Sequence, residues 1–141
     1  MFPPSRRESR ERALSLLYEA ESKQVEPAAV VADLPVEPDP FVADVVNGVG
    51  RESKRIDSLI SGHSIGWELE RMPVVDRAIL RMATYELIDR PDVPTAVIIS
   101  EAVDLAGQYS TDDSGRFVNG VLAAIAGEVR PDGAGEVRPE S

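Results

Sequence analysis

Apolar residues recur every three or four positions along most of the chain. In residues 5–24 this spacing gathers four apolar side chains on one face, as in an amphipathic helix: Ala13, Leu16, Leu17 and Ala20. The same periodicity predicts three further long helices, over residues 73–89, 94–109 and 115–129.

The middle of the chain carries a weaker helical signal. Residues 26–34 are predicted to form a short helix. A longer helix begins at Pro40 behind Asp39, a favoured N-terminal cap, and fades over residues 61–66. Two glycines inside that longer helix mark where it could bend: Gly48 and Gly50.

No segment shows the alternation of a β-strand. The stretch VPTAVIIS could form a short buried strand, but Pro94 and the following EAVDLA favour a helix. Residues 67–72 amount to a helical turn at most. The pattern therefore predicts an all-α fold of six or seven helices, with residues 1–130 as one domain and the Gly/Pro-rich residues 131–141 as a disordered tail.

Composition narrows the functional classes. The chain has 141 residues and no cysteine, which excludes disulfides and thiolate chemistry. The N-terminus lacks the apolar run of a secretory signal, and no apolar stretch approaches the roughly 20 residues of a membrane span. We therefore expect a cytoplasmic protein that does not enter a membrane.

Catalytic machinery is sparse in this sequence. His63 is the sole histidine and lies in a Gly/Ser-rich stretch. No His/Cys metal spacing and no nucleotide-binding glycine loop occur. The adjacent Asp112 and Asp113 read as helix-capping residues rather than an acid/base pair. We expect no catalytic residue, no bound metal and no cofactor, and hence no enzyme.

Charge is distributed unevenly. The formal net charge is −10, yet residues 1–12 hold four arginines against two glutamates, which leaves −12 for the rest of the chain. These arginines stand at a predicted helix N-terminus, where the helix dipole disfavours cations. Two interpretations stay open: a solvated helix end with pairs such as Arg7–Glu11, or a local site for phosphates with Tyr18 available for base stacking.

A second unusual stretch is DDSGRFVNGVL, residues 112–122. Asp113 or Ser114 is expected to cap the helix that follows. Gly120 inside that helix predicts a close approach of another backbone, since glycine is costly in a helix interior. Asn119 lies in an apolar context, which predicts a hydrogen-bonded position in the packed interior.

Four segments in this order resemble the NusB transcription antitermination family: RRESRERALSLLYE, VDRAILRMATYEL, DVPTAVIISEAVDLA and TDDSGRFVNGVL. The resemblance implies two three-helix bundles packed on each other and no catalysis. It implies binding of single-stranded boxA-type RNA of ribosomal RNA operons together with the ribosomal protein NusE, within an RNA polymerase antitermination complex. Some relatives pair through the RNA-facing surface, so the resemblance also allows a homodimer.

The resemblance also implies which residues bind. RNA would contact the first helix and two later motifs, through Arg6, Arg7, Arg10, Tyr18, Arg77, Arg116, Phe117 and Asn119. The partner protein would contact Tyr18, Asp76 and Asp113.

This sequence departs from the family pattern in charge. Glu8 interrupts the arginine run and the body is strongly acidic, so RNA binding is expected to depend on positive charge supplied by NusE. The alternative is a non-catalytic interaction scaffold whose arginines contact an acidic protein. Salt dependence of RNA binding separates the two hypotheses.

Overall fold

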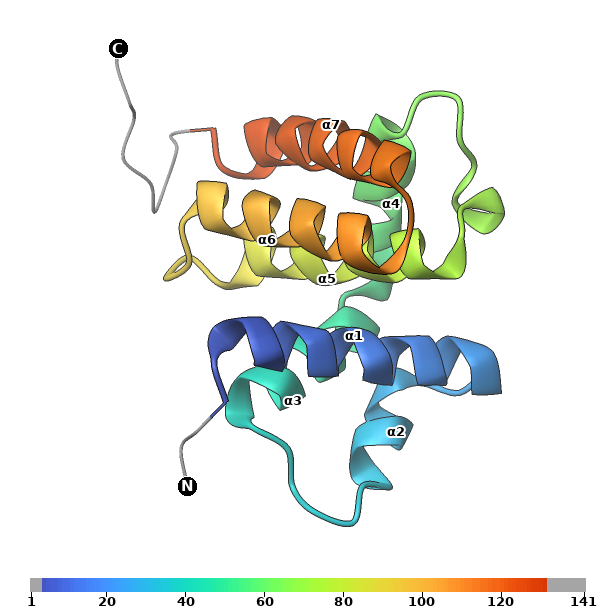
Figure 1. Cartoon of the computed structure of the whole chain (residues 1–141), viewed down its shortest axis with the longest axis vertical. Coiled ribbons are helices and arrows are strands. Elements are labelled where there is room, and N and C mark those ends of the chain that lie inside the picture. The colour runs from blue at the N-terminus through green and yellow to red at the C-terminus, as the bar shows by residue number, and fades with distance from the viewer. Residues whose placement is uncertain (1–3, 132–141) are drawn as a thin grey trace.

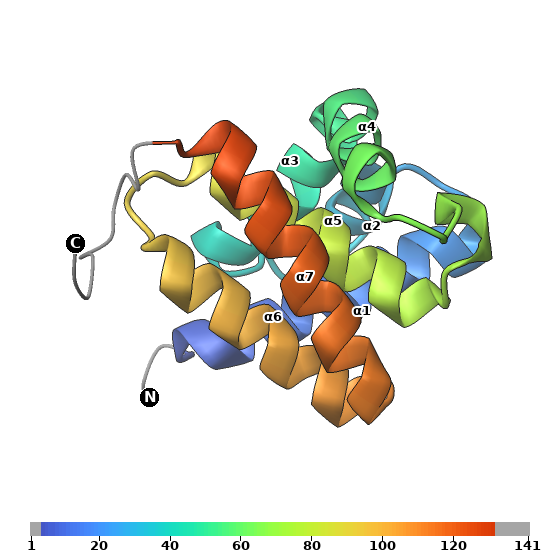
Figure 2. The ribbon, with the colours of Figure 1, turned by 90° about the horizontal axis from the view of Figure 1, so that it is seen from above.

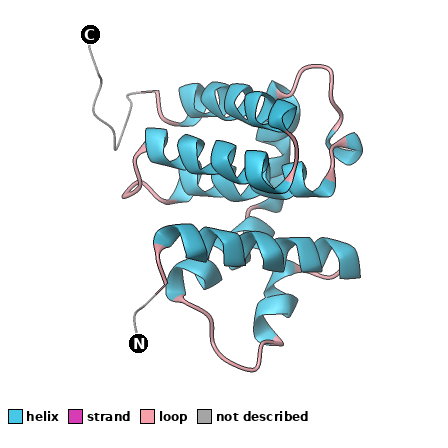
Figure 3. Cartoon of the chain, viewed as in Figure 1, coloured by secondary structure: helices cyan, strands magenta, loops and turns pink. Residues whose placement is uncertain are grey.

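Helices make up the ordered architecture of the protein. The structure, a computed structural model, describes residues 4–131, and no strand occurs among them (Figure 3). The elements are α1 (Arg6–Lys23), α2 (Pro27–Ala32), α3 (Pro40–Arg51), α4 (Ser53–His63), the 3₁₀ helix η1 (Leu69–Arg71), α5 (Val74–Asp89), α6 (Thr95–Tyr109) and α7 (Asp112–Val129). The all-α prediction is confirmed, whereas the predicted tail lies, from residue 132 onward, outside the described residues.

The helices form two packed groups. Helices α1, α2 and α3 form the N-terminal bundle, and α4 to α7 form the C-terminal one (Figure 1). Helix α5 is central because it contacts α1 and α3 of the first bundle as well as α4, α6 and α7 of its own. Seen from above, α6 and α7 lie next to each other and α1 runs beneath α6 (Figure 2). The predicted arrangement of two bundles is therefore confirmed, but the second bundle has four helices rather than the predicted three, because α4 packs against α5 and α7.

The first turns of α1 and α3 are capped by the side chains of residues that immediately precede each helix. Ser5 Oγ accepts the Glu8 N–H at 3.0 Å, and Glu8 Oε1 accepts the Ser5 N–H at 2.8 Å, which is a capping box. Glu8, which interrupts the arginine run, thus stabilises the start of α1. Asp39 accepts the Phe41 N–H at 3.1 Å, as its predicted capping role requires.

Helix α7 begins earlier than the periodicity suggests. Its cap is Thr111, whose hydroxyl accepts the Ser114 N–H at 3.1 Å, rather than Asp113 or Ser114. Asp112 and Asp113 therefore lie in the first turn, where carboxylates favour the helix dipole.

The helix predicted to run from residue 40 to about residue 60 is two helices. It breaks at Glu52, whose φ of −101° and ψ of 20° end α3 before α4 begins at Ser53. The chain passes from the first bundle to the second at this break (Figure 1). Apolar spacing continues across it, with Val49 and Ile56 both buried, so the pattern alone does not reveal a one-residue interruption.

Close packing against a glycine occurs at Gly48 rather than Gly120. The ring of Tyr85 lies against Gly48 so closely that a Cβ there would overlap ring carbons, with Cδ1 at 2.8 Å. Gly120 is exposed and has no such neighbour within 4 Å among the described residues. The prediction of a close crossing at Gly120 is wrong, because that face of α7 points to solvent.

Gly120→Ala should therefore stabilise the protein. An exposed helical glycine costs up to about 1 kcal/mol relative to alanine, and the added methyl meets open space here. We expect a rise of roughly that size in the free energy of unfolding, measured by urea denaturation. A fall would show that another group packs on this face.

Arg130 joins the end of α7 to the α5–α6 connection. Its guanidinium donates to the carbonyl oxygens of Leu87 at 2.9 Å, Val93 at 2.8 Å and Arg90 at 2.8 Å. Carbonyl groups at a helix C-terminus carry partial negative charge, so a buried cation is well placed there. The domain boundary predicted at residue 130 therefore falls on a residue that is packed into the fold.

Candidate nucleic-acid interface

Arg7 on α1 is paired with acidic residues of α6. Its Nε donates to Glu101 Oε1 at 2.6 Å, and its Nη2 donates to Glu101 Oε2 at 3.0 Å and to Asp104 Oδ2 at 2.9 Å. The hydrogen bond from Arg7 lowers the pKa of Glu101 and, in return, raises the pKa of Arg7. The Arg7 side chain remains 40% exposed. This contact links the two bundles at a solvent-accessible seam between α1 and α6.

Arg10 is buried, which corrects the expectation that it faces a ligand at the surface. Its Nε and Nη2 donate to the two carboxylate oxygens of Glu86 on α5, at 2.9 and 2.7 Å. Both side chains are at most 3% exposed. Position 10 of α1 faces α5, so its guanidinium serves the interface between the bundles.

Arg6 lies over the ring of Phe41, with its guanidinium carbon 4.1 Å from the ring centroid. Arg90 approaches the same ring at 5.0 Å and also pairs with Asp44 and Asp92. Arg6 is exposed, and no carboxylate of residues 4–131 lies within ion-pair distance of it. Three α1 arginines were singled out from the sequence. Arg7 and Arg10 are each paired with a carboxylate, whereas the N–H groups of Arg6 can still donate to an anionic ligand.

Tyr18 shares the solvent-facing stripe of α1 with Arg7 and Glu11. Its side chain is exposed and available to a partner or a base. One interpretation of the sequence paired Glu11 with Arg7, but the structure does not contain this pair. Glu11 instead accepts the hydroxyl of Tyr109 on α6 at 3.0 Å, which raises the pKa of that tyrosine.

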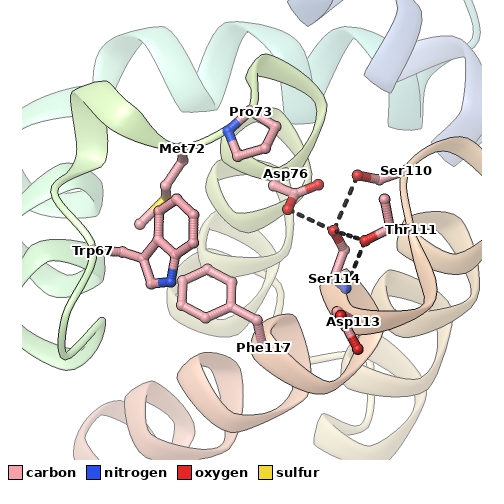
Figure 4. A pocket seen from close by; sticks show the side chains of 9 residues that line it. All are labelled: Trp67, Met72, Pro73, Asp76, Ser110, Thr111, Asp113, Ser114 and Phe117. Atoms are coloured by element: carbon pink, nitrogen blue, oxygen red, sulfur yellow. Dashed lines mark hydrogen bonds between the residues drawn. The ribbon is translucent and has the colours of Figure 1, made fainter.

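A pocket opens at the end of this seam, between η1, the start of α5 and the α6–α7 loop. Its volume is about 240 Å³. Nine side chains line it (Figure 4): Trp67, Met72, Pro73, Asp76, Ser110, Thr111, Asp113, Ser114 and Phe117.

Aromatic and acidic groups meet in this pocket. The rings of Trp67 and Phe117 stand 5.9 Å apart at an angle of 54° (Figure 4). Asp76 is 4% exposed and its Oδ2 accepts the Ser114 hydroxyl at 2.8 Å. Its Oδ1 has no hydrogen-bond partner among the described residues. A buried carboxylate oxygen without a donor is costly, so a bound N–H or O–H group would be favoured there.

The other predicted residues of α7 lie on its exposed side. Arg116 pairs with Asp113 at 2.6 Å, and both side chains are more than 80% exposed, so the pair contributes little to stability. Asn119 is exposed, which corrects its expected place in the packed interior. Both residues remain accessible to a ligand that reaches the pocket.

Arg77 supports the pocket rather than facing solvent. It donates to the carbonyl oxygens of Leu69 at 3.1 Å and Met72 at 3.3 Å, and to Glu21 at 2.9 Å. These bonds hold the η1 segment against α5. The Arg77 side chain is only 10% exposed and is bonded to the protein itself, so RNA binding by Arg77 stays a prediction for which this structure offers little accessible surface.

The structure thus gathers Asp76, Asp113 and Phe117 around one pocket and places Arg7 and Tyr18 on the solvent-facing stripe of α1. Sequence reasoning missed Trp67, whose only signal was its position as the sole tryptophan in a polar segment. It also missed Glu101 and Asp104, which nothing in their local sequence distinguishes from solvated acids.

The described residues include no helix that could span a membrane and no metal centre. None of their helices is long and apolar enough to cross a bilayer. No group of three or more His, Cys, Asp or Glu side chains among them is placed to hold a metal ion.

Comparisons with known proteins agree on one family. A family model described as the NusB family matches residues 7–127. A transcription antitermination protein NusB from Kineococcus radiotolerans is 46% identical over 126 residues, covering 86% of this chain and 93% of that protein. The corresponding protein from Beutenbergia cavernae is 44% identical over 135 residues, with 86% and 88% covered.

Solved structures show the same likeness. NusB of T. maritima superposes with a TM-score of 0.82 at 35% identity, covering 93% of this chain and 96% of that one. The antitermination factor in a crystal structure of NusB and NusE with double-stranded RNA superposes with a TM-score of 0.74 at 28% identity, with 87% and 96% covered.

Proposed function

This chain belongs to the NusB family, and on that premise we propose that it is a transcription antitermination factor. It binds single-stranded boxA-type RNA of ribosomal RNA operons in the cytoplasm together with the ribosomal protein NusE. The similar proteins bear the name of antitermination proteins, and one solved relative is held with NusE and double-stranded RNA. Its role is regulatory binding within the RNA polymerase antitermination complex, without catalysis.

The observation that carries this proposal is the Trp67–Phe117 pocket with Asp76 inside it. Aromatic faces stack unpaired bases whatever their sequence, whereas a carboxylate oxygen accepts the N–H groups found on base edges. A base turned out of a single strand offers both surfaces at once. No histidine is among the residues that line the pocket, which suits binding better than proton transfer.

The exposed residues divide between the two partners. Arg6, Arg116 and Asn119 are accessible to the RNA, while Tyr18 and Asp113 are accessible to NusE. Asp76 reaches either partner only through the pocket, since its side chain is buried. The acidic body repels phosphates, so a basic partner protein strengthens the RNA complex.

Phe117→Ala should weaken binding of a boxA-like RNA about tenfold in the presence of NusE. Losing one stacked base removes roughly 1–3 kcal/mol, and stacking releases no counterions, so the slope of log affinity against log salt should hold. Titrations at several salt concentrations, with and without NusE, measure both quantities.

Val97→Ala is the matched control, because it removes an exposed apolar side chain of α6 outside the pocket. It should leave RNA affinity unchanged. If the wild-type protein with NusE binds no RNA, or if binding is indifferent to salt, the RNA function fails and the arginines serve a protein partner instead.

A further inference from the structure

We propose that Glu101 and Asp104 mask Arg7 in the free protein and that an RNA phosphate must displace at least one of them to bind Arg7, so that these two carboxylates set the affinity for RNA. This inference rests on the proposed RNA function. It assigns a role to residues of α6 that contact Arg7 and lie outside the base pocket.

The hydrogen bonds of Arg7 leave no paired edge for a phosphate. A guanidinium grips an oxyanion through two parallel N–H groups. Glu101 occupies the edge formed by Nε and Nη2, and Asp104 takes a further hydrogen of Nη2. The remaining edge also requires Nη2, so a phosphate obtains two parallel bonds only after a carboxylate has left.

Exposure makes this exchange feasible. The side chains of Arg7, Glu101 and Asp104 are 40%, 22% and 55% exposed, so water reaches all three groups and most readily Asp104. Exposed ion pairs contribute little net stability and are easily broken. The pair of Arg10 and Glu86 offers a contrast, because both groups are buried and cannot be exchanged for a ligand without opening the bundle interface.

Without RNA, the local charges keep Glu101 and Asp104 bound to Arg7. Two carboxylates surround one guanidinium, and Glu11 adds a third negative charge one turn along α1. Arg7 holds the pKa of Glu101 below its ordinary range, so that carboxylate stays ionised at neutral pH. The seam is therefore net negative while it is closed, although it contains an arginine.

Displacement has a signature in salt dependence. A phosphate contact ordinarily releases counterions from the RNA, at about −0.7 in the slope of log affinity against log salt for each contact. A carboxylate that leaves Arg7 attracts salt cations from solution, and this uptake partly cancels the counterions released from the RNA. Removing the mask should therefore steepen the slope as well as tighten binding.

Glu101→Gln tests the mask while preserving side-chain shape. We expect it to tighten binding of a boxA-like RNA without NusE by about threefold to tenfold and to steepen the salt slope by up to about 0.7. Asp104→Asn should give a smaller gain, because Asp104 makes one bond to Arg7 where Glu101 makes two. Thermal unfolding of each variant confirms that the fold is retained.

Two comparisons decide whether the gain comes from Arg7. Glu11→Gln removes the same charge as Glu101→Gln, but from the stripe of α1 that carries Arg7 and without removing a partner of Arg7, so it should give a clearly smaller gain. In an Arg7→Ala background, Glu101→Gln should give no more gain than Glu11→Gln does.

The outcomes distinguish failure of the mask from failure of the RNA function. A gain from Glu101→Gln that persists without Arg7, an equal gain from Glu11→Gln, or no gain at all overturns the mask while the RNA function stands. Absence of RNA binding by every variant, with NusE present, overturns the RNA function and the mask together.

Discussion

Arg10→Ala should lower the free energy of unfolding by about 3–5 kcal/mol, the cost of leaving one member of a buried ion pair uncompensated. Glu86 would lose both hydrogen bonds, at 2.9 and 2.7 Å, while remaining enclosed between α1 and α5. Urea denaturation followed by far-ultraviolet circular dichroism measures the loss. The helix dipole alone would favour the opposite result, since it disfavours cations at the N-terminus of α1.

Two companion variants identify the cause. Arg12→Ala removes the same charge from an exposed position of α1 and should change stability by no more than about 0.5 kcal/mol. Replacing both partners, as Arg10→Met with Glu86→Leu, should recover much of the loss, because no buried charge is then left alone. If Arg10→Ala costs no more than Arg12→Ala, the buried pair does not hold the bundles together.

Gly48→Ala should destabilise the protein by about 3 kcal/mol, although alanine is the better helix former by about 1 kcal/mol. The new methyl would overlap the ring of Tyr85, which is 2% exposed. That ring is also held in place, since its hydroxyl donates to Asp44 at 2.8 Å and accepts from Arg51 at 3.3 Å. Burial and the bond to Asp44 raise the pKa of Tyr85, so the donor stays protonated at neutral pH.

The matched control is Gly120→Ala, which makes the same chemical change in a helix with open space around it. The two variants should move the free energy of unfolding in opposite directions. In a Tyr85→Ala background, Gly48→Ala should cost little, because the overlapping ring is gone. A stabilising Gly48→Ala would mean that α3 and α5 separate easily at this crossing.

These two contacts matter for function because they set one bundle against the other. Arg10–Glu86 and Gly48–Tyr85 both join the N-terminal bundle to α5. Helix α5 also carries Asp76, which lies in the base pocket, whereas α1 carries the stripe of Arg7 and Tyr18. A ligand that spans the stripe and the pocket therefore depends on the relative placement of the two bundles.

Helix content and most helix boundaries could be predicted because the signals for them are local. The spacing around Ala13 and Leu17, the cap at Asp39 and the proline at position 94 act within one or two turns of the backbone. The break at Glu52 escaped prediction because apolar spacing continues through it. Gly48 and Gly120 are both helical glycines, and only the neighbouring helix distinguishes them.

The candidate site was partly predictable for the same reason. Asp76, Asp113 and Phe117 were singled out by motifs, and they do line one pocket. Trp67 joins them from a segment without any motif. The burial of Arg10 was not predictable, since helical spacing places Arg7 and Arg10 on one stripe of α1 but does not reveal what covers each position.

By itself, then, the sequence determined an all-α chain, its principal helices and its family, through patterns that a few neighbouring residues carry. Only the tertiary structure decided which charges are free. Arg10 meets Glu86 across 76 positions of the chain and Arg7 meets Glu101 across 94. A charged side chain exerts its force through whichever groups surround it in space, and packing of the two bundles brings those groups together from distant parts of the chain.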